Sequence, residues 1–230
     1  MLASLLSLDY RRKRLLKRLP PGVMRDFYAV PFPSRSSDCR QLEFAALDLE
    51  TTGLNPQQDE ILSIGLVTLK GTQIELQSAT HRLVRPQQDI PENSAVIHHI
   101  TDDHAASGEP LAQVLGELLP RLAGKVLIAH HARFELQFLH SACERYFGSR
   151  FLMPTIDTQE VARRTLERRN QSFRPQQMRL AELRERYNLP RYRLHNALSD
   201  ALAAAELFLA QLAQYDLSRP VPVKNFLLKV

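Results

Sequence analysis

The stretch that most constrains the fold is the apolar segment from Phe44 to Gly53, because it ends by presenting two carboxylates. Leu47 and Leu49 alternate there with Asp48 and Glu50. In a β-strand this spacing places both acids on one face, about 7 Å apart along the chain. Two carboxylates held so close repel each other, and a divalent cation between them removes the repulsion. The segment therefore predicts a strand that ends in a cation site. The plainer alternative is an edge strand on which the two acids are only solvated.

The composition is typical of a globular protein. The 230 residues are 44% hydrophobic and 24% charged, which fits one folded domain with appendages. The apolar runs are all far shorter than a membrane span, so we expect no transmembrane segment. Cys39 and Cys143 have neither disulfide-framework nor metal-ligand spacing, and a reducing, cytoplasmic compartment is the simplest expectation.

Positive charge is concentrated in two parts of the chain. Residues 1–40 hold nine Lys or Arg against three acids, and the other residues hold 21 basic and 22 acidic side chains. A second basic stretch runs from Arg150 to Arg193, with 11 Arg against five acids. Such clusters neutralise phosphates in nucleic-acid-binding proteins, although many are only solvated surface. A polyanionic partner is therefore a hypothesis that other residues must support.

The chain divides into an arm, a domain and a tail. Residues 1–40 predict a basic arm, in which a partly amphipathic helix ends at Pro20 and a Pro- and Ser-rich connector follows. The apolar positions of this helix are Leu5, Leu8, Leu15, Leu16 and Leu19. The arm either binds nucleic acid, a membrane surface or a protein partner, or it docks on the domain by its leucines. Residues 41–215 form the domain, and residues 216–230 are a tail without an assigned structure.

The domain pattern predicts an α/β fold. Strand patterns at residues 44–51, 60–69 and 73–84 are joined by short turns and favour an antiparallel meander. The patterns that follow predict further strands and helices in alternation. Strands are expected at 125–129 and 155–158, and helices at 91–97, 110–122, from Phe134 onward, and at 159–169, 178–187 and 197–215. This order indicates a mixed sheet of about five strands flanked by helices.

Three further side chains could join the acid pair. Glu135 is expected in the first turn of the helix after the strand at 125–129, and Asp200 lies in the last helix with His195 five residues before it. An acid on an apolar helix face needs a charged partner or must point outward. Four carboxylates and a histidine could thus converge at one end of the sheet, although the pattern alone does not demonstrate it.

Four short motifs resemble the DEDDh exonuclease family, which includes the proofreading epsilon subunit of bacterial DNA polymerase III and ribonuclease T. In chain order they are Asp48-Leu-Glu50-Thr-Thr-Gly53-Leu, Ile97-His98-x-Ile100-Thr101, Ala129-His130-x-Ala132-x-Phe134 and His195-x-Ala197-x-x-Asp200-Ala201. The resemblance extends from about Phe44 to Gln214, roughly three quarters of the chain. It implies a ribonuclease H-like fold and hydrolysis of nucleotides from a 3′ end with two divalent metals.

The resemblance also implies a role for each acid and for His195. Asp48, Glu50 and Asp200 would hold one metal, and Asp48 would share a second metal, to which Glu135 contributes. Hard oxygen ligands favour Mg²⁺ or Mn²⁺ over zinc. His195 would be the general base that deprotonates the attacking water, since histidine titrates near neutral pH.

The same resemblance predicts substrate contacts around the acids. Thr51, Thr52 and Leu54 would border the terminal nucleotide, with Leu54 as an apolar wedge, although an ordinary polar turn is the alternative. His98 and His130 are interpreted as structural histidines or as histidines at the edge of the site that contact the substrate, without a catalytic part.

Three residues depart from the family pattern. Glu135 stands in place of Asp, which moves the carboxylate by about 1.5 Å. His131 in place of Asn loses an amide that both donates and accepts hydrogen bonds, and His99 in place of Gly puts a tight turn in question. The departures surround the second metal, so we expect slower activity, a preference for Mn²⁺, an altered substrate or a loss of activity.

The leading hypothesis is a metal-dependent 3′→5′ exonuclease of the epsilon-subunit type that acts on single-stranded or frayed DNA ends. RNA or short oligonucleotides are the nearest alternative substrates. A hypothesis from another class is a catalytically silent relative that binds nucleic acid or docks on a protein partner through the arm. A small-molecule metal phosphatase fits less well, because it leaves the basic stretches unexplained.

Overall fold

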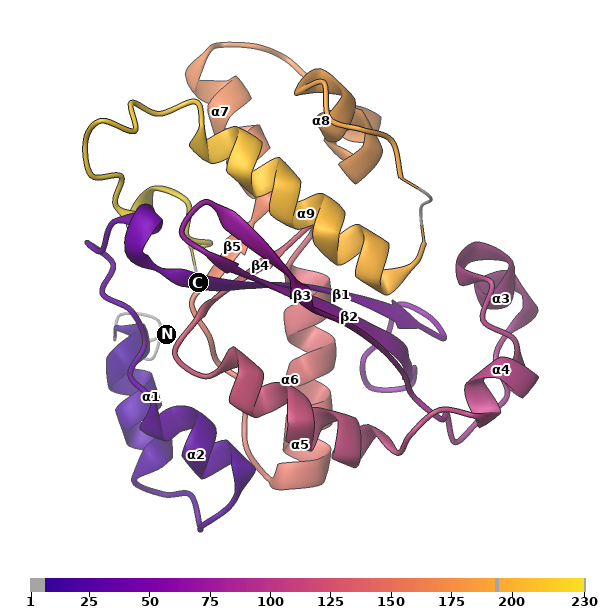
Figure 1. Cartoon of the computed structure of the whole chain (residues 1–230). Coiled ribbons are helices and arrows are strands. Elements are labelled where there is room, and N and C mark those ends of the chain that lie inside the picture. Colours follow the sequence, from indigo (N-terminus) through magenta and orange to yellow (C-terminus); the bar gives the residue numbers. More distant parts are fainter. Residues whose placement is uncertain (1–6, 193–194, 230) are drawn as a thin grey trace.

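A five-stranded mixed sheet forms the centre of the computed structural model, which describes residues 7–192 and 195–229 (Figure 1). Its strand order is β3-β2-β1-β4-β5. The first three strands pair antiparallel, whereas β4 is parallel to β1 and β5 is parallel to β4. The strands are β1 (Glu43–Thr51), β2 (Ile61–Lys70), β3 (Gln73–Leu83), β4 (Val126–Ala129) and β5 (Thr155–Asp157). The predicted mixed sheet and its antiparallel meander are confirmed.

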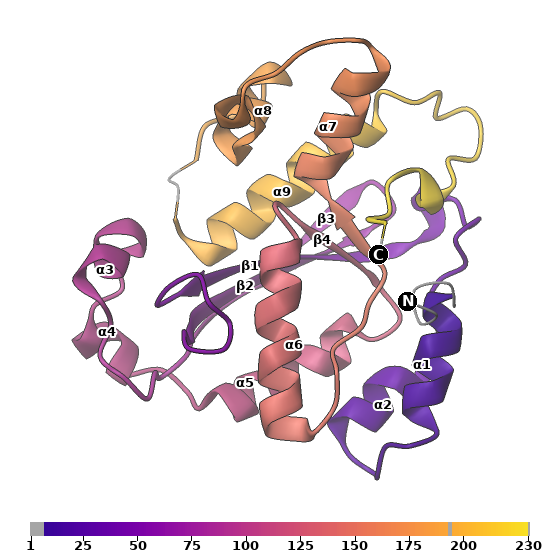
Figure 2. The same ribbon diagram turned by 180° about the vertical axis from the view of Figure 1, so that it is seen from behind.

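Helices cover both faces of the sheet, so that the molecule has three layers (Figures 1 and 2). One face carries α5 (Leu111–Leu122) and α6 (Arg133–Phe147). The other carries α9 (Ala197–Leu212), with α7 (Thr158–Arg168) and α8 (Leu180–Arg186) packed against it. Two short helices, α3 (Glu92–His98) and α4 (Asp102–Ala106), lie beyond the carboxyl end of β1. Among the described residues, no helix combines the length and apolarity that crossing a bilayer requires.

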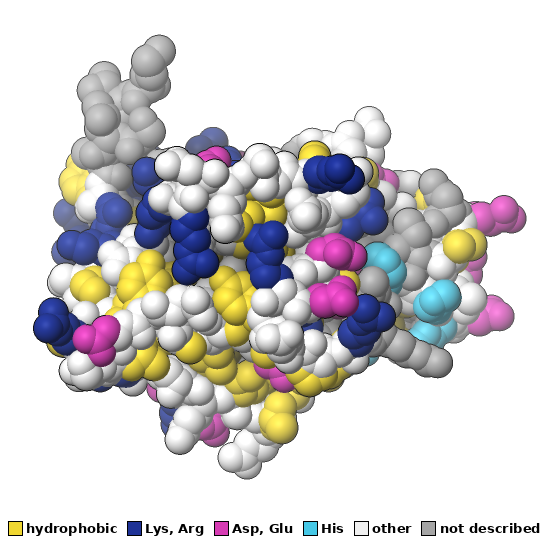
Figure 3. Space-filling model, turned by 90° about the horizontal axis from the view of Figure 1, so that it is seen from above, with side chains coloured by type: hydrophobic (Ala, Val, Ile, Leu, Met, Phe, Trp, Pro, Cys, Tyr) yellow, Lys and Arg dark blue, Asp and Glu magenta, His cyan; other side chains and the backbone are white. Residues whose placement is uncertain are grey.

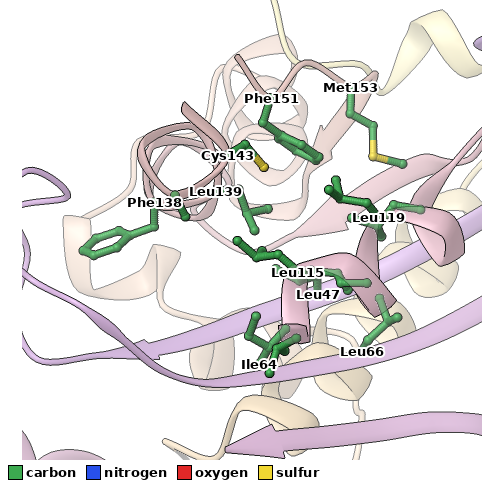
Figure 4. Close-up of a cluster of buried hydrophobic side chains, with 14 of the residues drawn as sticks. Leu47, Ile64, Leu66, Leu115, Leu119, Phe138, Leu139, Cys143, Phe151 and Met153 are labelled. Atoms are coloured by element: carbon green, nitrogen blue, oxygen red, sulfur yellow. The ribbon is translucent and has the colours of Figure 1, made fainter. Parts of the chain in front are cut away.

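Alternate residues of β1 face the two helical layers, as the strand period requires. Leu47 and Leu49 belong to the hydrophobic cluster on the α5–α6 side, where Leu47 lies near Leu115 and Leu139 (Figure 4). Phe44 points the other way and packs on Phe208 of α9, with ring centroids 5.2 Å apart. The acids continue the alternation of Phe44, so β1 delivers them to the α9 side.

The amino-terminal segment packs on the domain. Two helices, α1 (Leu8–Leu16) and α2 (Val23–Ala29), cover the α5 side of the core. Leucines of and after α1 contact this core, and α2 buries three side chains in it; they are Leu15, Leu16, Leu19, Met24, Phe27 and Tyr28. Of the alternatives for the arm, a helix docked by its leucines describes this packing, while Leu5 lies outside the described residues. The sequence pattern does not predict α2, because seven residues are too few for a periodic stripe.

The tail also packs on the domain. Val221, Val223 and Phe226 are buried in the cluster beneath α9, and the backbone N–H of Cys39 donates to the carbonyl of Val221 at 2.9 Å. The segment before β1 and the tail therefore contact each other and the core. The division at residues 40 and 215 stays a prediction, with both end segments in contact with the central domain.

Most predicted elements are present within two or three residues of their expected bounds. The predicted helix at 178–187 is α8, and a 3₁₀ turn, η3 (Pro175–Met178), comes before it. The last helix ends at Leu212 instead of residue 215. The short helix α4 has no predicted counterpart. Thr101 caps this helix, because its side-chain hydroxyl accepts a hydrogen bond from the His104 N–H at 3.4 Å. A capping residue adds no apolar periodicity, so a periodic pattern does not predict this helix.

Candidate active site

Three carboxylates converge where β1 and the start of α9 meet. One oxygen each from Asp48, Glu50 and Asp200 lies within 4.8 Å of the others. Asp48 and Glu50 come from β1, and Asp200 comes from the first turn of α9. The sequence expectation that Asp200 joins the acid pair is therefore met by the geometry. Glu50 and Asp200 are buried and Asp48 is half-buried.

Gly65 explains how α9 comes close enough. It lies directly opposite Asp48 in the β1–β2 pair, on the face that α9 covers. A Cβ atom at Gly65 would stand 2.1 Å from the carbonyl carbon and oxygen of Ala197. The absence of a side chain thus lets the first turn of α9 rest on β2. Asn196 caps this turn, accepting from the Ser199 N–H at 3.1 Å.

The electrostatics of the cluster favour a bound cation. Burial, with the nearby charge of Asp200, raises the pKa of Glu50 to about 7. The pKa of Asp48 is raised well above its ordinary value by burial and then by Glu135, Asp200 and Glu50. Within the described part of the chain, the buried Oδ1 of Asp200 has no hydrogen-bond partner. Buried carboxylate oxygens with repelling charges and an unpaired acceptor fit a divalent metal with oxygen ligands.

Glu135 approaches the cluster from the other helical layer. It lies in the first turn of α6, is buried, and is close enough to raise the pKa of Asp48. It is not one of the three carboxylates that meet within 4.8 Å. Its Oε2 is buried without a hydrogen-bond partner among the described residues. Of the four acids expected to converge, three therefore form the compact group, and Glu135 lies beside it.

Asp157 is a buried acid that the sequence analysis does not single out. Its carboxylate accepts from the backbone N–H groups of His131 and Ala132, both at 3.1 Å, and from that of Gln159 at 3.0 Å. It therefore joins the turn before α6 to the start of α7. Burial raises the pKa of Glu135 well above its ordinary value, and the charge of Asp157 adds to this effect. An Asp before a helix is a capping signal, but the bonds to a distant turn leave no local pattern.

His195 lies at the mouth of the site. Its side chain is exposed, its backbone has a left-handed φ of 64°, and its N–H donates to Oδ2 of Asp200 at 2.8 Å. This bond ties the loop of the predicted base to one of the three acids. The backbone of His195 is thereby held next to the cluster, and its exposed imidazole remains accessible to water and substrate.

His98 and His130 each have both ring nitrogens hydrogen-bonded. The Ile100 N–H donates to Nδ1 of His98, and Nε2 of His98 is 2.8 Å from the hydroxyl of Ser94, which donates to the carbonyl of Thr51. This chain of bonds links α3 to the end of β1. Burial, followed by the charges of two other histidines, lowers the pKa of His98.

His130 has a comparable role beneath β4. Nε2 donates to the carbonyl of Met178 at 3.0 Å, so Nδ1 accepts from the Thr158 hydroxyl at 2.8 Å. Burial lowers the pKa of His130 to about 4. The ring is neutral and joins β4 to α7 and η3, which supports the structural interpretation of this residue.

The turn after β1 places one apolar side chain in solvent. Leu54 is 84% exposed, whereas Thr51 and Thr52 are buried. The Thr51 hydroxyl donates to the carbonyl of Gly53 at 2.6 Å, and the Thr52 hydroxyl accepts from the Glu60 N–H at 2.9 Å. These bonds hold the turn in place, and Leu54 projects from it into solvent four residues after Glu50.

The family departures at His99 and His131 coincide with special backbone geometry. Both residues have left-handed φ angles, 58° and 66°. His99 ends α3 in the conformation for which glycine is the usual residue. The turn is thus formed with histidine in place, at a cost of about 1 kcal/mol.

Basic side chains lie on the side of the molecule that carries α7, α8 and α9. Figure 3 looks down on the α7, α8 and α9 side, where Lys and Arg side chains extend toward the end at which acidic and histidine side chains gather. Arg193 of the predicted basic stretch lies outside the described residues. The basic helix α1 is at the opposite end of the sheet from the carboxylates (Figures 1 and 2). The two basic stretches therefore differ in their relation to the site.

Comparisons with known proteins agree with this architecture. The DNA polymerase III subunit epsilon of Treponema pallidum is 30% identical over 172 residues, which are 75% of this chain and 77% of the relative. The PolC-type DNA polymerase III of Thermotoga maritima is 36% identical over 166 residues, but this chain spans only 12% of its length.

Solved structures show the same fold. The nuclease domain of 3′hExo, a DEDDh family member, matches with a TM-score of 0.63 and 18% identity over 77% of this chain and 95% of that domain. Exonuclease I of E. coli matches with a TM-score of 0.65 and 16% identity over 76% of this chain and 41% of its own. The predicted ribonuclease H-like fold is confirmed. A model of the exonuclease family RNase_T matches residues 45–208, and the chain belongs to this exonuclease family.

Proposed function

We propose that the chain is a metal-dependent 3′→5′ exonuclease that removes nucleotides from single-stranded or frayed DNA ends. The observation that carries the proposal is the meeting of Asp48, Glu50 and Asp200 beside a loop that holds His195. The match to the epsilon-subunit relative covers most of that relative's length. Its name refers to a DNA polymerase, and this supports DNA as the substrate that we propose for this chain. RNA and short oligonucleotides are the alternative substrates.

Each site residue receives a role, and Asp48 serves both cations. Asp48, Glu50 and Asp200 would hold one divalent cation, and Glu135 with Asp48 would hold a second. Bound Mg²⁺ or Mn²⁺ would supply positive charge that acidifies water and neutralises the leaving 3′ oxygen. His195 accepts the proton of the attacking water on its exposed imidazole. Water adds to phosphorus, the bond from phosphorus to the 3′ oxygen breaks, and a 5′-nucleotide leaves.

The surrounding residues bind and orient the strand end. The exposed Leu54 packs against the terminal base, and the buried Thr51 and Thr52 keep its turn rigid. His98 and His130 border the nucleotide and fix the adjoining segments.

A cytoplasmic location and a protein partner for the basic arm stay predictions. The exposed Lys17 and Arg18 would make such a contact with a partner, since the nearby leucines are engaged in the core.

Strands labelled at one end test the proposal. With Mn²⁺ or Mg²⁺, a 3′-labelled DNA strand should release labelled mononucleotide from the first time point, and a 5′-labelled strand should give a descending ladder. The same pair of RNA strands, run in parallel, ranks the two substrate classes. Labelled oligonucleotides released from the 3′ end, or no release from any strand, would contradict the proposal.

A catalytically silent nucleic-acid-binding relative is the second candidate, because Glu135 stands outside the group of three carboxylates. Calorimetric titration with Mn²⁺ separates the two candidates. Two bound ions favour the enzyme, and no binding favours the silent relative.

A further inference from the structure

A buried arginine connects α8, α9 and the loop that carries His195. The guanidinium of Arg184 donates to the carbonyl of Ala203 in α9 and to the carbonyl of Pro190 in the loop, both at 2.8 Å. It also contacts the carboxylate of Glu206 at 2.7 Å. Arg184 is only 3% exposed, so it reaches these partners inside the protein and not in solvent.

Tyr192 closes this set of contacts. Its ring lies under the Arg184 guanidinium, with the central carbon 4.5 Å from the ring centroid. Its hydroxyl donates to the other carboxylate oxygen of Glu206 at 2.8 Å. Three side chains thus hold each other through one ion pair, one hydrogen bond and one cation–π contact. We call Arg184, Glu206 and Tyr192 the loop clamp.

The clamp acts on the segment that ends at the site. Tyr192 precedes His195 by three residues, and His195 is itself bonded to Asp200 through its backbone N–H. The loop is therefore fixed at Pro190 and Tyr192 by the clamp and at His195 by a carboxylate of the cluster. A buried ion pair adds little to stability compared with apolar packing, so stability alone does not account for the clamp.

We propose that Arg184 and its two clamp partners are positioning residues that hold the imidazole of His195 against the carboxylate cluster. This inference rests on the proposed function, in which His195 is the base. A base displaced by about 1 Å loses one to two powers of ten in rate. No clamp side chain makes a hydrogen bond or ion pair with Asp48, Glu50 or Asp200. A clamp variant that leaves every charge in place should therefore leave the binding of cations at the cluster unchanged.

Tyr192→Phe is the mildest test, because it removes one hydroxyl and keeps the ring. Tyr187→Phe is the matched control, since the hydroxyl of Tyr187 makes no side-chain hydrogen bond within the described part of the chain and lies at the start of the same loop. We expect Tyr192→Phe to lower kcat about tenfold, with KM and Mn²⁺ affinity within twofold of the wild type. Arg184→Lys, which keeps the charge but not the fork of donors, should lower kcat further.

A double-mutant cycle with His195→Ala separates positioning from general damage. If the clamp acts through His195, Tyr192→Phe has no further effect on the residual activity of His195→Ala. An equal tenfold loss in both backgrounds, or a wild-type kcat in Tyr192→Phe, overturns the inference while the exonuclease assignment stands. A wild-type chain that releases no nucleotide overturns the proposed function and the inference with it.

Discussion

At the scale of single residues, Glu135 is the acid whose position distinguishes this site. It is buried beside Asp48 but outside the group of three carboxylates, so it would hold the second cation together with Asp48. We expect Glu135→Gln, which keeps the shape and removes the charge, to lose one of two Mn²⁺ ions in calorimetry and at least tenfold in kcat. Glu144→Gln, an exposed change on the same helix, is the control. Two bound ions with unchanged kcat would show that Glu135 holds no metal.

The raised pKa of Glu50 predicts how pH affects the metal-free protein. Its pKa is about 7 in the folded chain, against an ordinary value of 4.5. The folded state therefore holds this proton more tightly, and the resulting stability is present below pH 4.5 and lost as the pH rises through 7. The loss amounts to about 3 kcal/mol for this group. The raised pKa of Asp48 acts in the same direction.

Thermal unfolding in a chelator measures this effect. The melting temperature should fall between pH 5 and pH 8, Glu50→Gln should reduce that fall, and Mn²⁺ should stabilise the protein most at pH 8. A metal-free protein that becomes more stable over this range would contradict the account of the carboxylate cluster.

His99 carries a separate prediction about strain. Its left-handed φ of 58° costs a histidine about 1 kcal/mol, which glycine avoids. We expect His99→Gly to stabilise the protein by up to about 1 kcal/mol in urea unfolding, with part of the gain offset by the more flexible unfolded chain. His104→Gly, inside α4, should destabilise it. A destabilised His99→Gly would mean that the imidazole makes contacts that outweigh the strain.

At the scale of elements, the contact between β2 and α9 assembles the site. Gly65→Ala would place a methyl carbon 2.1 Å from the backbone of Ala197, so the start of α9 must move away from the sheet. We expect a destabilisation of about 2–3 kcal/mol and weaker Mn²⁺ binding, because Asp200 moves with the helix.

Gly116→Ala is the matched control for this change. A Cβ at Gly116 meets nothing within 4 Å, and alanine is the better helix former by about 1 kcal/mol. The control should therefore leave cation binding unchanged and stabilise α5. If Gly65→Ala bound Mn²⁺ as tightly as the wild type, the close packing of α9 on β2 would not be what positions Asp200.

At the scale of the whole molecule, the sequence predicts the sheet and the acids better than it predicts what holds them. The alternation in β1 and the order of strands and helices follow from local periodicity, which is visible in any short window. Gly65, Asp157 and Arg184 act through backbone atoms far along the chain, and no local pattern records such contacts. The helix α2 shows the same limit, because its burial of Phe27 and Tyr28 depends on a distant core.

The arrangement of charge is also a property of the whole molecule. The arginines of α7 and α8 lie in the layer that also contains α9, the helix of Asp200, whereas α1 lies at the other end of the sheet (Figures 1 and 3). A short strand bound at the site would thus meet the first basic surface and not the second. The composition does not distinguish the two basic stretches, and only the fold shows that they lie in different places.

The central claim is that the β1 carboxylates and His195 form a working exonuclease site. The most direct measurement is the rate of mononucleotide release from a 3′-labelled DNA strand by the wild type, Asp48→Asn and His195→Ala, with Asp26→Asn on α2 as a control far from the site. The account predicts a loss of at least a hundredfold for Asp48→Asn and for His195→Ala and an unchanged rate for Asp26→Asn. Equal rates in all four proteins would contradict it.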